Sequence, residues 1–213
     1  MLVENRVFSS GLIGEHGLAL YLEVKDVTGH RTRLLFDTGQ TGEPLILNAR
    51  SLRLNLRRLD AIIISHGHYD HTGGLKHALR AVTRRIPVIL HPHALKTRYR
   101  GKTRPKNIGI PFSRQDLEQL GADIQLVEKP MKLGKGVYVT GQIPRQAPDN
   151  ATGFYLDQEG TLVPDHILDD QALVLHLRKK GLLVVTGCGH AGLLNIIAAA
   201  QQLARDAPIY GII

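Results

Sequence analysis

The sequence contains no tryptophan and a single cysteine, and only 5% of its residues are aromatic. One cysteine excludes an internal disulfide and fits a reducing compartment. Few aromatic side chains mean few platforms for stacked bases, which argues against a nucleic-acid groove. Charges or glycines break every apolar run below the length of a membrane span, and the first residues lack a signal-peptide pattern. We therefore expect a soluble, cytoplasmic protein that does not enter a membrane.

Acidic residues are also scarce relative to basic ones: 19 aspartates and glutamates stand against 27 lysines and arginines, which gives a formal net charge of +8. Basic residues gather in segments 52–58, 95–106 and 178–180. Solvated surface is the simplest interpretation of these segments. A more specific interpretation is a site for an anionic small molecule, and nucleic-acid binding ranks last. The oligomeric state is not indicated by the sequence.

The length of 213 residues and a hydrophobic content of 43% suit a single domain over residues 1–213. Apolar spacing predicts helices at 44–56, 73–85, 113–121 and 191–206, with Ser113 as an N-cap and Gly121 as a stop. Strands are predicted at 18–24, 31–37, 61–65, 87–91, 123–128, 136–142, 172–177, 182–187 and 208–213. This mixture predicts an α/β layered domain with a mixed sheet.

The densest group of titratable side chains is "HGHYDH", residues 66–71, directly after the apolar run at 61–64. In a tight loop the side chains of His66, His68, Asp70 and His71 can converge. Imidazole nitrogens and a carboxylate are ligands for zinc, manganese or iron. Packing gives no reason to place four such groups after a buried strand. The segment therefore predicts a metal site.

The motif "SHGHYDHTGG" resembles the His-x-His-x-Asp-His signature of the metallo-β-lactamase superfamily, and further segments extend the resemblance over nearly the whole chain. Their order is similar to that in the dihydropteroate-synthase-like branch, which carries the label 7,8-dihydropterin-6-ylmethyl-4-(β-D-ribofuranosyl)aminobenzene-5'-phosphate synthase. The segments are 15–23, 34–39, 65–75, 141–145, 164–173 and 181–197. The resemblance implies an αββα sandwich, with mixed sheets flanked by helices and a two-metal site at one sheet edge.

The resemblance also implies roles for individual residues. His66 and His68 would hold a first divalent metal, and Asp70 and His71 a second, with zinc favoured over manganese or iron. Asp70 would in addition orient the attacking water. Asp37, in "LLFDTG", matches an aspartate that braces the metal loop through hydrogen bonds, although a turn-forming role before Thr-Gly explains it equally well.

A second constellation, "TGCGHAG" at 186–192, lies where a strand ends and a helix begins. Here His190 is the third ligand expected from the resemblance. Cys188 stands near the position of a metal-bridging aspartate, so it is either a ligand, a residue behind the ligands, or a buried thiol. Arg145 is expected to bind an anionic group of the substrate.

Three less specific groups accompany these residues. Asp165 and Asp170 are weaker candidates for the site. His91 and His93 have the spacing of a ligand pair but follow another strand, so we interpret them as active-site wall or surface. His16 is a candidate to line the cleft.

The family pattern continues beyond the last strand with a Gly-Gly-x-His segment, whose histidine completes the second metal site. Because the chain stops at "IYGII", we expect a domain that lacks its C-terminal end. The leading hypothesis is a metal-dependent hydrolase or related transferase, in which a metal-activated water acts on a phosphorylated or acyl small molecule, with a pterin-related molecule as one version. A catalytically silent metal-binding or ligand-sensing domain is the alternative, and a metal-dependent nuclease is a third.

Overall fold

A computed structural model describes residues 1–7, 9–204 and 207–213, which group into two compact units. The first unit comprises residues 1–90 and 110–126, and the second comprises residues 91–109 and 127–213. The α/β class predicted from the sequence is confirmed, since the described residues form several sheets flanked by helices. Within these described ranges, no helix has both the length and the apolar character needed to cross a bilayer.

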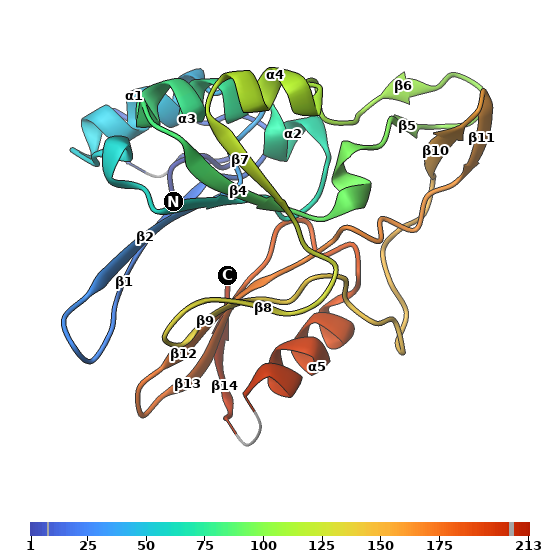
Figure 1. The fold of residues 1–213 in the computed structure, drawn as a ribbon. Helices are drawn as coiled ribbons and strands as arrows, with labels where there is room; N and C mark the ends of the chain where they lie inside the picture. Colours follow the sequence, from blue (N-terminus) through green and yellow to red (C-terminus); the bar gives the residue numbers. More distant parts are fainter. Residues whose placement is uncertain (8, 205–206) are drawn as a thin grey trace. The chain divides into compact units, whose positions relative to one another are not determined.

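The first unit contains a five-stranded sheet with helices on one face (Figure 1). Its elements are β1 (Leu20–Lys25), β2 (Arg31–Phe36), β3 (Ala61–Ile63), β4 (Ile86–Leu90), β7 (Ala122–Leu126), α1 (Glu43–Ser51), the 3-10 helix η1 (Leu56–Arg58), α2 (Tyr69–Thr72), α3 (Leu75–Val82) and α4 (Arg114–Gln119). The strand order is β1-β2-β3-β4-β7, with β1 antiparallel to β2. Strands β2, β3, β4 and β7 run parallel, so their carboxyl ends meet at one edge of the sheet.

Helix α3 shows why the sequence pattern predicts this layer. Its residues at positions i, i+3, i+4 and i+7 are buried and face the unit's core. They are Leu75, Ala78, Leu79 and Val82. Burial of each larger side chain contributes about 1.5–3 kcal/mol. At the start of α4, the predicted N-cap is confirmed, because Ser113 Oγ accepts a hydrogen bond from Asp116 N over 3.1 Å.

Two helices are shorter in the structure than the sequence predicts. The helix predicted at 44–56 ends at Ser51, because Arg53 adopts a left-handed φ of 56°. The helix predicted at 73–85 begins at Leu75 and ends before Thr83, which has a φ of 62°. In both cases the apolar spacing continues past a residue whose backbone cannot extend a right-handed helix.

The second unit contains two sheets and one long helix. Its elements are η2, a 3-10 helix (Pro92–Leu95), β5 (Arg98–Arg100), β6 (Lys106–Asn107), β8 (Met131–Gly134), β9 (Val137–Val139), β10 (Phe154–Gln158), β11 (Thr161–Pro164), β12 (Leu173–Leu177), β13 (Gly181–Val185), α5 (Leu193–Leu203) and β14 (Ile209–Ile212). The sheet orders are β14-β13-β12-β9-β8 and β11-β10-β5-β6. Apolar residues of α5, β12 and β13 share one buried core, which includes Ile196, Val174 and Leu182.

The smaller sheet of the second unit was missed by the sequence prediction. Strand β5 lies inside the basic segment 95–106, which was interpreted as a loop with a solvated or anion-binding surface. The four strands of this smaller sheet are two to five residues long, too short for a clear alternation of apolar and polar residues. The helix predicted at 191–206 begins at Leu193 after Gly192, and residues 205–206 of that prediction lie outside the described residues.

Candidate metal centre

Two segments of the first unit follow neighbouring parallel strands and are tied together at the carboxyl edge of the sheet. Asp37 comes directly after β2, and the histidine loop follows β3. The Asp37 amide donates to the carbonyl of Ile63 over 2.8 Å. The Thr38 amide donates to the carbonyl of His71, also over 2.8 Å. This edge of an open parallel sheet is where binding sites commonly lie.

Asp37 is fully buried and connects the two segments through its carboxylate. Oδ1 accepts a hydrogen bond from Ser65 N at 2.7 Å, and Oδ2 accepts one from Ser65 Oγ at 2.7 Å. Oδ2 also lies 2.7 Å from His71 Nδ1. Because the carboxylate accepts, Nδ1 of His71 donates, which fixes the ring and turns Nε2 toward the loop interior.

The backbone of Asp37 has a φ of 58°, in the left-handed region where aspartate is enriched among residues other than glycine. Asp37 therefore has both of the roles that the sequence left open, the turn-forming role and the bracing role. It makes the turn after β2, and it braces the histidine loop.

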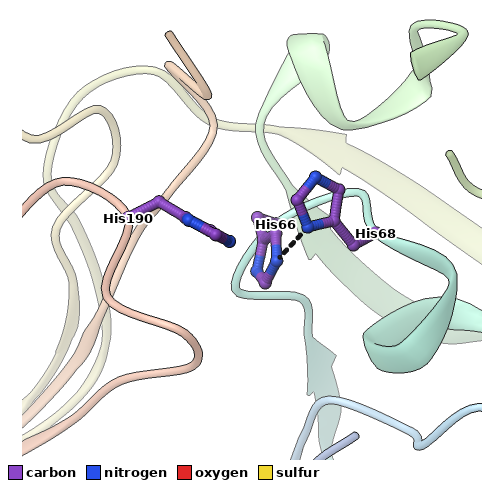
Figure 2. Close-up of side chains that lie close together, drawn as sticks. All are labelled: His66, His68 and His190. Carbon is purple, nitrogen blue, oxygen red and sulfur yellow. Dashed lines mark hydrogen bonds between the residues drawn. The ribbon is translucent and has the colours of Figure 1, made fainter. Parts of the chain in front are cut away.

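Three imidazoles converge in the loop after β3, and all three are buried. His66 Nε2 lies 2.9 Å from Nδ1 of His68, the hydrogen bond drawn in Figure 2. On its other side, His66 Nδ1 lies 2.9 Å from Ser65 Oγ. The centroids of the His66 and His71 rings are 4.3 Å apart. Within this unit, the sequence-predicted residues His66, His68 and His71 are therefore neighbours.

Asp70 adds a carboxylate to the three imidazoles. Its Oδ2 lies 3.4 Å from His71 Nε2 and 3.3 Å from His16 Nε2. Burial alone would raise the pKa of Asp70, but the hydrogen bond and charge of His71 outweigh it and hold the pKa at about 2. Asp70 is therefore ionised at neutral pH, the state in which a carboxylate binds metal.

The segment "EHGL" at 15–18 supports Asp70 from outside the histidine loop. The His16 ring contacts the carboxylate and also lies 2.9 Å from Asn5 Oδ1. Gly17 packs so closely that a Cβ there would lie 1.9 Å from the carbonyl oxygen of Asp70. Gly17 also has a φ of 115°, so both its backbone and its packing require glycine. In the sequence His16 and Gly17 stand far from Asp70, and no local pattern reveals their contact with it.

The donor set of this loop fits a divalent metal of the zinc class. Three imidazoles and an ionised carboxylate are gathered in a buried loop, with one ring nitrogen of His66 and one of His71 held by oxygen atoms behind the loop. Metal-binding histidines generally have such a partner on the second nitrogen.

In the second unit, His190 lies on the loop between β13 and α5 and is also labelled in Figure 2. Its ring meets the Phe154 ring edge-on, with centroids 5.0 Å apart. Its carbonyl accepts a hydrogen bond from Asn150 N over 3.0 Å. Asp170 Oδ2 accepts from the next amide, Ala191 N, over 2.6 Å. Asp170 thus holds the loop that carries His190.

Cys188 and Arg145 belong to the same part of the second unit. The Cys188 thiol is exposed, so the buried-thiol interpretation does not describe it. Arg145, predicted to bind substrate, directs its guanidinium inward: Nη1 pairs with Asp149 Oδ2 at 2.5 Å, and Nη2 donates to the carbonyl of Ile167 over 2.7 Å. These contacts tie the loop that contains Arg145 and Asp149 to the loop that contains Ile167.

The second unit contains a buried ion pair that the sequence does not predict. Arg98 is fully buried and makes two hydrogen bonds to Asp169, of 2.8 and 2.5 Å. Its Nε lies 3.1 Å from Asp165 Oδ2. Burial opposes the charge of Arg98, but the two aspartates hold its pKa above the usual value. Asp165, a weaker site candidate in the sequence, is thus a partner of Arg98.

His91 and His93 begin the second unit at η2. His91 is 2% exposed, and its Nδ1 accepts a hydrogen bond from His93 N over 3.1 Å. Burial lowers the pKa of both rings, which favours neutral imidazoles. Burial of His91 excludes the interpretation of this residue as surface.

Comparison with known proteins gives consistent matches. A family model described as the metallo-beta-lactamase superfamily matches residues 24–166. A 7,8-dihydropterin-6-methyl-4-(beta-D-ribofuranosyl)-aminobenzene-5'-phosphate synthase from Methanocaldococcus jannaschii is 30% identical over 97% of this chain and 72% of the relative. An uncharacterized protein of that organism is 31% identical over 99% of this chain and 77% of the relative.

Among solved structures, the crystal structure of Tm1679, described as a metal-dependent hydrolase of the beta-lactamase superfamily, aligns with a TM-score of 0.75 and 26% identity. The alignment covers 96% of this chain and 70% of that one. The structural similarity to Tm1679 therefore extends beyond residues 24–166, the range of the family model, to nearly the whole chain.

Proposed function

Because this chain belongs to the metallo-beta-lactamase superfamily, we propose that it is a metal-dependent hydrolase or a related transferase. The observation that carries the proposal is the buried group of three imidazoles and one ionised carboxylate after β3, braced from behind by Asp37. The name of the Methanocaldococcus jannaschii relative supports an enzyme, and that of Tm1679 supports a metal-dependent one.

We assign His66 and His68 to a first divalent metal, and Asp70 and His71 to a second. His190 is proposed as a further ligand from its place in the family motif, with Cys188 as a ligand or a residue behind the ligands. Zinc suits these donors best, and manganese or iron are the alternatives. Divalent metals held by such donors supply Lewis acidity and make water a nucleophile near neutral pH.

The chain's own residues orient the reaction. Asp70 is ionised at neutral pH and accepts a hydrogen bond from the attacking water, which directs a lone pair of the water toward substrate. His16 lies against the same carboxylate and limits its rotation. Asp37 keeps the His71 ring in one orientation, so the geometry of the loop is set before substrate binds.

We propose a phosphorylated or acyl small molecule as the substrate class, with Arg145 as a candidate contact to its anionic group. The pterin-related version follows from the name of the Methanocaldococcus jannaschii relative, a synthase whose product carries a 5'-phosphate. In that version the substrates are a pterin pyrophosphate and an aminobenzene ribosyl phosphate, and the amine of the second displaces pyrophosphate from the first.

The proposed activity is tested with the full chain loaded separately with Zn²⁺, Mn²⁺ and Fe²⁺. Phosphoesters, lactones and pterin precursors are assayed with each form. We expect turnover of at least one class, and Asp70→Asn is expected to lower kcat/KM by about 10² to 10⁴ because the water loses its acceptor. The control is Asp157→Asn, at an exposed position of β10 in the second unit.

Absence of turnover with every metal and substrate would reject the enzyme. Asp70→Asn as active as the wild type would reject the role of Asp70. Hydrolysis without a condensation product from pterin precursors would remove only the pterin version.

The brace is tested by Asp37→Asn. Asparagine tolerates the left-handed backbone, but its amide nitrogen replaces one of the two oxygens that accept hydrogen bonds from Ser65 and His71. We expect the metal dissociation constant to rise about 10- to 100-fold. The measurement is competition with a chelating indicator, with Asp26→Asn at an exposed turn as the control. Unchanged metal affinity would restrict Asp37 to making the turn.

A further inference from the structure

The first unit contains a cavity of about 500 Å³ at the ends of two helices, and none of its lining residues belongs to the histidine loop. It lies between the last turn of α1, the segment 53–57 and the end of α3. Four arginines line it: Arg50, Arg53, Arg57 and Arg80. Apolar residues, including Ile46 and Leu54, complete the wall. Part of this wall belongs to the basic segment 52–58, which has no role in the proposed function.

The charges of this cavity are unbalanced. No described lining residue is acidic, and no described carboxylate forms an ion pair with any of the four arginines. Elsewhere in the same unit, Arg31 and Arg33 both pair with Glu23. Four like charges around one hollow repel each other, and an anion in the hollow relieves that repulsion.

Helix dipoles explain only part of the cluster. Arg50 and Arg80 lie in the last turns of α1 and α3, where a cation is favourable. Arg53 lies outside any helix, and its φ of 56° is the turn that ends α1. Arg57 lies in the short η1, where its amide donates to Asn55 Oδ1 over 3.1 Å. The convergence of all four on one cavity therefore requires a further reason.

The geometry points to a binding site for a small organic diphosphate in this cavity. Guanidinium groups match phosphate oxygens in pairs, and two phosphates engage four such groups. The volume falls in the range of small-molecule sites, and the apolar wall at Ile46 and Leu54 accommodates the organic part of the ligand. Because the cavity is a hollow with few aromatic neighbours, a small ligand fits it better than a single-stranded nucleic acid.

The test compares two neighbouring arginines of η1. Arg57 lines the cavity and Arg58 does not, while both are exposed and carry the same charge. Inorganic pyrophosphate is titrated into the full chain by calorimetry at constant ionic strength. We expect saturable binding, a dissociation constant raised about tenfold by Arg57→Gln, and less than a twofold change with Arg58→Gln. Arg80→Gln is expected to reproduce the loss from a different element.

Four outcomes would overturn the site. Binding that does not saturate, or equal losses in Arg57→Gln and Arg58→Gln, would indicate general electrostatic attraction. A dissociation constant unaffected by Arg57→Gln and by Arg80→Gln would place pyrophosphate elsewhere, for instance on a bound metal. A single-stranded oligonucleotide that binds more tightly, with affinity falling steeply with salt and lost in Arg57→Gln, would assign the cavity to nucleic acid.

Discussion

The double variant His66→Ala/His68→Ala is expected to bind fewer metal ions per chain than the wild type, because its affinity for the first metal of the proposed pair falls at least about 100-fold. Loss of a single supporting contact behind a ligand weakens metal affinity about 10- to 100-fold, and this variant removes both residues proposed to hold the first metal. The measurement is elemental analysis after equilibration with Zn²⁺ and gel filtration, which gives metal bound per chain.

The matched control is His30→Ala/His176→Ala, which removes two exposed histidines from strand ends or turns. It is expected to keep the wild-type metal content. Circular dichroism shows whether the first double variant remains folded, because His66 and His68 are buried and their removal leaves space in the loop. A folded variant with unchanged metal content would reject the assignment of these two residues.

The variant Arg98→Met is expected to destabilise the protein by about 3–5 kcal/mol. Loss of the Arg98 guanidinium leaves the buried carboxylates of Asp165 and Asp169 without the charge that balances theirs. The apolar replacement preserves most of the side-chain volume, so the lost free energy of unfolding reports mainly on the uncompensated carboxylates. Urea denaturation at neutral pH measures this change.

Arg100→Met is the matched control, because Arg100 is exposed and lies two residues along the same strand, β5. Surface substitutions generally change stability by less than about 0.5 kcal/mol. The double variant Arg98→Met/Asp169→Leu is expected to recover part of the lost stability, since it removes a buried charge together with its partner. Equal destabilisation by Arg98→Met and Arg100→Met would contradict a structural role for the buried pair.

The parts that the sequence predicts well depend on local patterns. The histidine loop is visible because its ligand types are adjacent in the chain, and the buried strand before it places them at the edge of a sheet. The N-cap at Ser113 is visible for the same reason, since its partner is three residues away. The ends of α1 and α3, before Arg53 and Thr83, are not visible in the sequence, because a left-handed backbone at those residue types has no clear signature.

The parts that the sequence does not predict depend on contacts between distant residues. Arg98 and Asp169 are 71 residues apart, and in the sequence Arg98 is one of several cations in a basic segment. Likewise, the carboxylate of Asp37 reaches His71 across 34 residues, a contact suggested only by the family resemblance. The four arginines of the cavity come from α1, η1, α3 and the turn at 53, so no single segment reveals their shared location.

The most direct test of the proposed centre is the position of the metal itself. Crystals of the full chain grown with Zn²⁺ are measured at the zinc absorption edge, and an anomalous difference map is calculated. We predict a peak about 2.0–2.1 Å from a ring nitrogen of His66 and of His68. A map with no peak beside these two rings, from crystals whose solution contains excess Zn²⁺, would contradict the metal centre.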